Sequence, residues 1–135
     1  MSETPNTNPA QERDRDALRY TEYHEWLAVD GDTVTLGITD YAANQLGDIV
    51  FVDAPEAGRE VHAGEVIAEI ESTKSVGEVS APFDGTVVES NAAAVDAPET
   101  LNSDPFGAGW LVRITPAGDV PDFLDLARYR ALTGE

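Results

Sequence analysis

Cysteine is absent from the 135-residue sequence, and lysine occurs once, at Lys74. Without cysteine, the chain can form no disulfide bridge and has no thiolate chemistry of its own. No apolar run is long enough to cross a bilayer, so we expect no membrane association. The two histidines, His24 and His62, are far apart in sequence and lack the spacing of metal ligands. The side chains therefore offer neither thiol chemistry nor a histidine metal site.

Positive charge is also scarce, because 8 basic residues accompany 26 acidic ones and the formal net charge is −18 at pH 7. Such a surface repels nucleic-acid phosphates and anionic lipids, so we expect no nucleic-acid binding. The acidic residues run through the whole length instead of forming one tail, which favours an acidic soluble surface. High salt screens the self-repulsion of such a surface. The composition is thus typical of a halophilic cytoplasm, and a cytoplasmic location is predicted.

The length suits one domain with one core. Residues 1–17 are polar and lack the apolar segment of a secretory signal, so we predict that they form a disordered arm. Residues 18–135 are predicted to be a single domain.

Short apolar runs with regular turn signals predict a mainly β fold, a sandwich or barrel. Val34, Leu36 and Ile38 alternate with Thr33, Thr35 and Gly37 as in a half-buried strand, and residues 25–39 are predicted to form a hairpin. Further strands are expected within residues 48–55, 59–62, 65–72, 75–82, 85–91 and 110–116.

Helical signals are few, and both predicted helices should pack outside the sandwich. Thr39 offers an N-cap oxygen for a short internal helix over residues 40–46, which Gly47 should end. A C-terminal helix is predicted at about 121–133, beginning at Pro121 or Asp122. Residues 92–109 are rich in Ala, Asn, Asp, Pro and Gly, and we predict an irregular loop there.

Lys74 lies in the run EIESTKSVGEV, residues 69–79, between two predicted strands. Small hydroxyl residues surround it and favour a turn, so its side chain should lie in water at a hairpin tip. Arginine carries the same charge and occurs seven times. A single retained lysine therefore indicates chemistry of the amine, which can form an amide as the guanidinium cannot. A Schiff-base lysine needs a desolvated pocket, so cofactor attachment is favoured. An ordinary surface lysine is the alternative.

Residues 37–91, with G-I-T-D at their start and E-S-T-K around the lysine, resemble the lipoyl-carrying H proteins of the glycine cleavage system. YTEYHEWL (residues 20–27) and LNSDPFGAGWLVRI (residues 101–114) are similar to other markers of that family. The resemblance covers residues 19–132. It implies a β-sandwich of the lipoyl and biotinyl carrier type (a barrel-sandwich hybrid), with lipoate joined to Lys74 through an amide.

The resemblance also implies a function in glycine catabolism and one-carbon metabolism. The lipoyl arm would accept an aminomethyl group at a glycine decarboxylase (P protein) and deliver it to an aminomethyltransferase (T protein). A dihydrolipoyl dehydrogenase (L protein) would reoxidise the arm, and a lipoate-attaching enzyme would install it. We expect a monomeric carrier without turnover of its own.

Two carboxylates gain roles through the same resemblance. The loaded arm of these carriers folds into a surface cleft that shelters it from water. Glu25, in H-E-W, would pair there with the cationic amine, and Glu78, four residues after Lys74, would make a further contact. Members of that family commonly have a serine two residues before the glutamate of H-E-W, where this chain has Tyr23. His24 is expected to be a hydrogen-bonded structural residue, and Trp26 and Trp110 to be packing residues.

Three alternatives remain open from the sequence. A biotin carrier usually has methionine on both sides of the lysine, where this chain has Thr73 and Ser75. A lipoyl domain of a 2-oxoacid dehydrogenase continues through Pro/Ala-rich linkers into larger domains. A lipoyl relay protein that delivers lipoate to other enzymes would need the same lysine and is not separated from glycine cleavage by the sequence.

Overall fold

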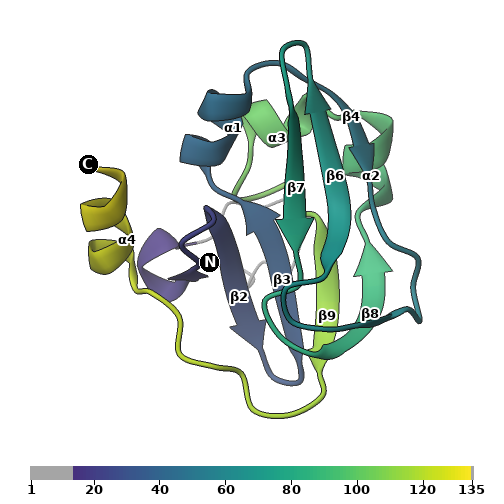
Figure 1. Ribbon diagram of the computed structural model, residues 1–135, viewed down its shortest axis with the longest axis vertical. Coiled ribbons are helices and arrows are strands. Elements are labelled where there is room, and N and C mark those ends of the chain that lie inside the picture. The colour runs from purple at the N-terminus through teal and green to yellow at the C-terminus, as the bar shows by residue number, and fades with distance from the viewer. Residues whose placement is uncertain (1–13, 135) are drawn as a thin grey trace, which may run out of the picture.

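The computed structural model describes residues 14–134, whose strands form two antiparallel sheets (Figure 1). The mainly β prediction is confirmed. One sheet has the order β1-β2-β3-β9-β8-β5, and the other has the order β4-β6-β7. The strands of the first sheet are β1 (Arg19–Tyr20), β2 (Glu25–Asp30), β3 (Thr33–Ile38), β9 (Val112–Pro116), β8 (Gly85–Ser90) and β5 (Glu60–Val61). Those of the second are β4 (Ile49–Asp53), β6 (Val66–Ser72) and β7 (Val76–Ser80).

The hydrophobic core includes buried side chains from both sheets, and a second cluster packs around Trp26, Trp110 and Tyr129. Strand β3 is not half-buried as predicted, because Thr35 and Gly37 are buried as well. This strand lies between β2 and β9. Burial of both tryptophans, at 0% and 4% exposure, confirms that they are packing residues.

Gly37 leaves room for the indole of Trp26, whose Nε1 donates a hydrogen bond to the carbonyl of Pro105 at 3.0 Å. A Cβ at residue 37 would lie 2.5 Å from Trp26 Cε2. We expect Gly37→Ala to lower the free energy of unfolding by about 1–3 kcal/mol, because overpacking forces the ring to move. Denaturant unfolding measures this. Gly118→Ala is the control, since a Cβ there meets no atom within 4 Å, and equal midpoints for both variants would contradict the prediction.

The internal helix agrees with the prediction. Helix α1 (Asp40–Leu46) begins after Thr39, whose side chain accepts a hydrogen bond from the Ala42 N–H. It ends at Gly47, which has φ of 87°. That left-handed conformation costs glycine little.

The prediction of an irregular loop over 92–109 is wrong in part. Helix α2 (Ala92–Asp96) and helix α3 (Thr100–Ser103) lie within that range. Asn91 caps α2 by accepting hydrogen bonds from the N–H groups of Ala93 and Ala94. A capping side chain followed by three alanines is a helix start, which the abundance of turn residues downstream obscured.

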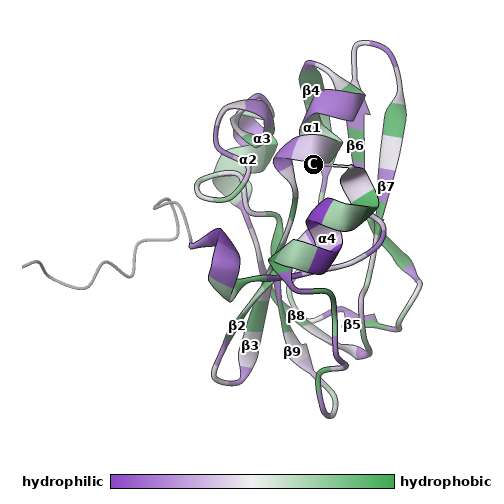
Figure 2. Cartoon of the chain, turned by 90° about the vertical axis from the view of Figure 1, so that its left-hand side faces the viewer, coloured by the Kyte–Doolittle hydropathy of each residue, from purple (hydrophilic) through white to green (hydrophobic). Residues whose placement is uncertain are grey.

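The predicted start of the C-terminal helix is also wrong. Helix α4 (Leu126–Thr133) begins after Asp125, whose side chain accepts a hydrogen bond from the Arg128 N–H. The preceding residues are held extended because Leu124 and Tyr20 exchange backbone hydrogen bonds of 2.8 and 2.9 Å. The helix ends before Gly134, as predicted. Figure 2 shows α4 on the face nearest the viewer, beside the segment that enters β1.

The predicted disordered arm falls mostly on residues 1–13, which lie outside the described residues. Its last part is ordered, because Arg15–Ala17 form a 3-10 helix that Asp14 caps. Tyr20 holds this turn by donating a hydrogen bond from its hydroxyl to the Arg15 carbonyl at 2.9 Å. The division into an arm and a single domain stays a prediction. Among residues 14–134, no helix is long and apolar enough to cross a membrane.

Candidate cofactor attachment site and cleft

The predicted lysine hairpin is confirmed, with Lys74 in the turn between β6 and β7 at the top of Figure 1. Ser72 closes this turn. Its N–H donates to the Ser75 carbonyl at 2.8 Å, and its Oγ accepts from the N–H groups of Lys74 and Ser75 at 3.2 and 3.0 Å. The Thr73 N–H donates to the Asp48 carbonyl at 3.0 Å, which ties the turn to the chain after α1. The lysine therefore projects from a turn that is braced on two sides.

The Lys74 side chain is exposed, and no salt bridge joins it to another residue within 14–134. Its stem crosses Gly47, because a Cβ at that glycine would lie 3.3 Å from Lys74 Cε. The side chain of Asn102 holds the segment that follows α1, because it donates to the Gly47 carbonyl and accepts from the Ile49 N–H, both at 2.9 Å. An acyl group can reach only an accessible primary amine, so the site fits a group attached through an amide.

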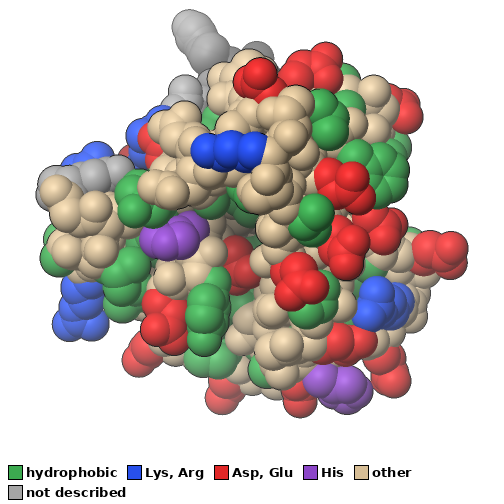
Figure 3. Space-filling model, turned by 45° about the horizontal axis from the view of Figure 1, so that its top comes forward, with side chains coloured by type: hydrophobic (Ala, Val, Ile, Leu, Met, Phe, Trp, Pro, Cys, Tyr) green, Lys and Arg blue, Asp and Glu red, His purple; other side chains and the backbone are tan. Residues whose placement is uncertain are grey.

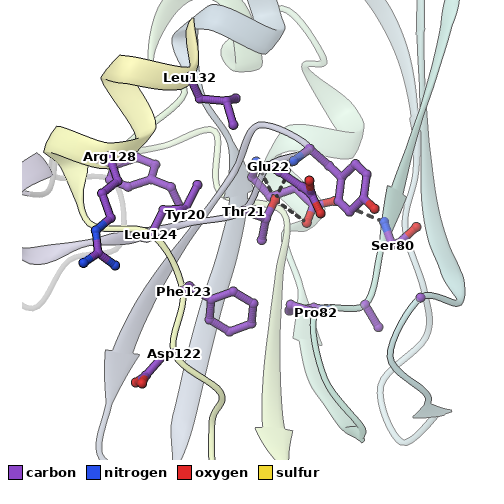
Figure 4. A pocket seen from close by; sticks show the side chains of 14 residues that line it. Tyr20, Thr21, Glu22, Ser80, Pro82, Asp122, Phe123, Leu124, Arg128 and Leu132 are labelled. Carbon is purple, nitrogen blue, oxygen red and sulfur yellow. Dashed lines mark hydrogen bonds between the residues drawn. The ribbon is translucent and has the colours of Figure 1, made fainter.

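A cleft of about 770 Å³ lies beside the far end of β7 (Figure 4). Ser80 and Pro82 stand on one side, and Phe123, Leu124 and Leu132 of the C-terminal segment stand on the other. Its floor comes from the turn between β1 and β2. The lining residues are Tyr20, Thr21, Glu22, Tyr23, Glu25, Gly64, Ser80, Ala81, Pro82, Asp122, Phe123, Leu124, Arg128 and Leu132.

Glu25 is the buried carboxylate of this cleft, with 3% of its surface exposed. The turn before it is closed by a hydrogen bond of 2.9 Å from the Thr21 N–H to the Glu25 carbonyl, and His24 takes the left-handed conformation with φ of 69°. Glu25 Oε1 accepts from Thr21 Oγ1, and Oε2 accepts from the Ser80 N–H, both at 3.2 Å. Burial raises the pKa of Glu25 to about 7, although both hydrogen bonds act to lower it.

The surroundings of Glu25 suit a cation. No salt bridge joins this carboxylate to a residue of the described chain. A buried ionised carboxylate without a counter-ion is costly. A positively charged group that enters the cleft would remove that cost and would be held by it.

The structure does not bring Glu78 to the cleft. Glu78 is exposed on β7, opposite Glu69 of β6, and is not one of the lining residues. Lys74 and Glu25 lie near opposite ends of β7, because Lys74 precedes this strand and Ser80, its last residue, binds Glu25. A group attached to Lys74 must therefore extend along β7 to reach the carboxylate.

His24 has the structural contacts expected for it. Its Nδ1 lies 2.9 Å from the Tyr129 hydroxyl, which lies 2.7 Å from Thr39 Oγ1. This chain of polar contacts ties α4 to the start of α1. Burial lowers the pKa of His24, so the neutral ring is favoured.

Comparisons with known proteins agree with this geometry. A family model described as "Glycine cleavage H-protein" matches residues 18–133. The glycine cleavage system H protein of Clavibacter sepedonicus is 54% identical over 122 residues, covering 90% of this chain and 98% of that one. The one from Beutenbergia cavernae is 54% identical over 114 residues, covering 84% and 91%.

A solved structure shows the same fold. The crystal structure of a glycine cleavage system H protein from Mycobacterium marinum superposes with a TM-score of 0.83 at 44% identity. The match covers 89% of this chain and 98% of that chain. The predicted lipoyl-carrier type of sandwich is thereby confirmed. With most of both lengths matched in sequence and in structure, the chain belongs to the glycine cleavage H-protein family.

Proposed function

We propose that this chain carries lipoate as an amide on Lys74 and serves as the carrier between the enzymes of glycine cleavage. The observation that carries the proposal is the single lysine of the sequence, exposed at the tip of a braced hairpin. Lys74 Nζ would attack the acyl carbon of an activated lipoyl donor supplied by the attaching enzyme, so that the amide bond forms, the bond to the activating group breaks, and the amine loses a proton. When bound, lipoate supplies a disulfide that accepts the aminomethyl group of glycine.

Glu25 then acts as the acceptor for the cationic amine. Its carboxylate is fixed by Thr21 and Ser80 at the base of the cleft. The apolar side chains of Phe123, Leu124 and Leu132 line the C-terminal wall of the cleft, and an arm that packs against them would lose contact with water. A sheltered adduct is protected from hydrolysis. A contact between Glu78 and the arm stays a prediction, with Glu78 placed outside the cleft.

The partners follow from this role. Glycine decarboxylase, aminomethyltransferase and dihydrolipoyl dehydrogenase each act on the arm in turn, and a lipoate-attaching enzyme installs it. Turnover belongs to these enzymes, and this chain contributes transport and shelter without catalysis. The monomeric state, the cytoplasmic location and the halophilic habitat stay predictions.

Peptide mass analysis of protein from its native host tests the attachment. Cleavage after Glu71 and Glu78 releases Lys74 in the peptide 72–78. We expect this peptide to carry one lipoyl addition, and protein made in cells without lipoate to carry none. A biotin-sized addition would support the carboxylase carrier instead. A bare lysine in a host with working lipoate metabolism would refute the proposal.

A further inference from the structure

The outer face of the β4-β6-β7 sheet carries an apolar patch beside the lysine hairpin. Phe51 pairs with Glu71, and Glu71 pairs with Val76. Directly paired residues share one face of a sheet, so these three side chains form a row. The register shift between Ile49 and Phe51 leaves Val50 unpaired beside it. Val50, Phe51 and Val76 are 54%, 48% and 59% exposed, and we call them the hairpin patch.

A row of three carboxylates borders the hairpin patch. Asp53 pairs with Glu69, and Glu69 pairs with Glu78, two residues further from the hairpin tip along each strand. All three side chains are exposed, and none forms an ion pair with a residue in the described range. Strands β4, β6 and β7 contain no basic residue. Figure 3 shows acidic side chains, with apolar ones among them, on the right of the view, the side where Figure 1 places β4 and β6.

The row of carboxylates is unfavourable for the stability of the sheet. Like charges directly opposite on neighbouring strands destabilise the pairing, and here Glu69 faces a carboxylate on both sides. Exposed apolar side chains that lie together differ from single ones, because a shared patch marks an interaction site. Val29 and Val88, at 55% and 47% exposure, lie on separate strands of the other sheet and have no such setting.

We propose that the hairpin patch and its carboxylate row dock the enzyme that acylates Lys74. The partner surface is an apolar depression bordered by Lys and Arg side chains, since opposite charges steer association and fix orientation. This inference rests on the proposed function, in which Lys74 is the modified residue. It adds the surface that the attaching enzyme recognises.

The position of the hairpin patch, next to Lys74, favours the attaching enzyme over the other partners as the protein that docks there. That enzyme must reach the amine of an unmodified lysine, so its surface must cover the residues next to the hairpin tip. Val76 is two residues from Lys74, so the backbone atoms of the two residues lie at most about 7 Å apart. Enzymes that meet the finished arm can dock farther from the hairpin, because the arm bridges the gap.

Lipoylation of the unmodified protein by the attaching enzyme tests the apolar part. We expect Val76→Asp to lower kcat/KM for this protein about tenfold at low ionic strength. Val29→Asp is the matched control, with the same change at nearly the same exposure, and should leave kcat/KM unchanged. Denaturant midpoints of both variants show that they fold. Equal rates for the two variants would overturn the proposal.

A charge reversal tests the carboxylate row with a readout that a structural role would not give. Glu69→Lys replaces two repulsions with two attractions across the strands, so it should raise the unfolding midpoint. The same variant should lower kcat/KM for lipoylation about tenfold and make kcat/KM less dependent on salt. Asp32→Lys makes the same change of charge in the turn between β2 and β3. A rate loss that is no larger for Glu69→Lys than for this control would overturn the proposal.

The two proposals fail in different ways. If Lys74 of the unchanged protein accepts no lipoate, the proposed function fails. If Lys74 is lipoylated normally in every variant of the outer face, only the docking surface fails. Weaker binding of glycine decarboxylase with unchanged lipoylation would also overturn the inference, since the face would then serve a different partner.

Discussion

Lys74→Arg is expected to leave the fold intact and to remove both lipoylation and glycine-dependent carbon dioxide exchange. The side chain is exposed and has no ion pair among residues 14–134, so arginine can replace it without loss of a fixed contact. The guanidinium is effectively always protonated and offers no free amine for an amide. Exchange by the glycine decarboxylase should therefore fall to the level measured without any carrier.

A second variant tests whether lipoylation requires a lysine at position 74 or only an exposed lysine somewhere in the chain. Lys74→Arg combined with Arg59→Lys keeps one exposed lysine in the chain but places it away from the hairpin, before β5. This double variant should also stay unmodified in intact-mass analysis. A lipoyl addition on either protein, or carbon dioxide exchange above the carrier-free level, would mean that the chemistry does not depend on the hairpin amine.

Local signals were enough to predict the attachment hairpin and helix α1. Ser72 and Ser75 close the turn around Lys74, and Thr39 and Gly47 bound the helix through contacts within three or four residues. Such contacts depend on the immediate sequence and on little else. Lys74 could thus be placed correctly before the two sheets were known.

Strand faces were predicted less well, because alternation assumes an unbroken ladder. In β6, Ile67 is buried and Val66 is 40% exposed, the reverse of what alternation from Ile70 predicts. A register shift between Val66 and Ala68 causes this reversal. A bulge moves every side chain beyond it to the other face, and neither residue signals the bulge.

The family resemblance predicted a cleft that contains Glu25, but the other residues that form it were beyond prediction because they come from distant segments. Thr21 stands four residues before Glu25, but Ser80 reaches the same carboxylate from 55 residues away. The C-terminal wall exists because Leu124 pairs with Tyr20 and delays the helix. The sequence pattern identified Glu25 only through a family resemblance, and it gave no sign that this carboxylate would be buried.

Glu25→Gln is expected to stabilise the unmodified protein by about 3 kcal/mol above neutral pH and to leave it nearly unchanged in mild acid. The pKa of Glu25 is about 7 in the fold, raised from 4.5 by burial. The folded state therefore binds more protons than the unfolded state between these values, and stability falls as pH rises through this window. An amide has no charge to bury. Its oxygen can still accept from the Ser80 N–H, while Thr21 Oγ1 keeps the hydrogen bonds that it accepts from the N–H groups of Tyr23 and Glu25.

The free energy of unfolding, measured in denaturant at about pH 5 and about pH 8.5, checks this sign, because Glu25 is mostly protonated at the first and mostly ionised at the second. Glu56→Gln is the control, since it removes an exposed carboxylate that forms no ion pair with another described residue. The gain from Glu25→Gln should be larger by about 2–3 kcal/mol at the higher pH, and a gain that is equal at both would mean that the buried carboxylate is not the cause. The same cost explains why the cleft favours a cation. Ionisation of the buried Glu25 destabilises the fold, and an ammonium group beside the carboxylate would offset that destabilisation.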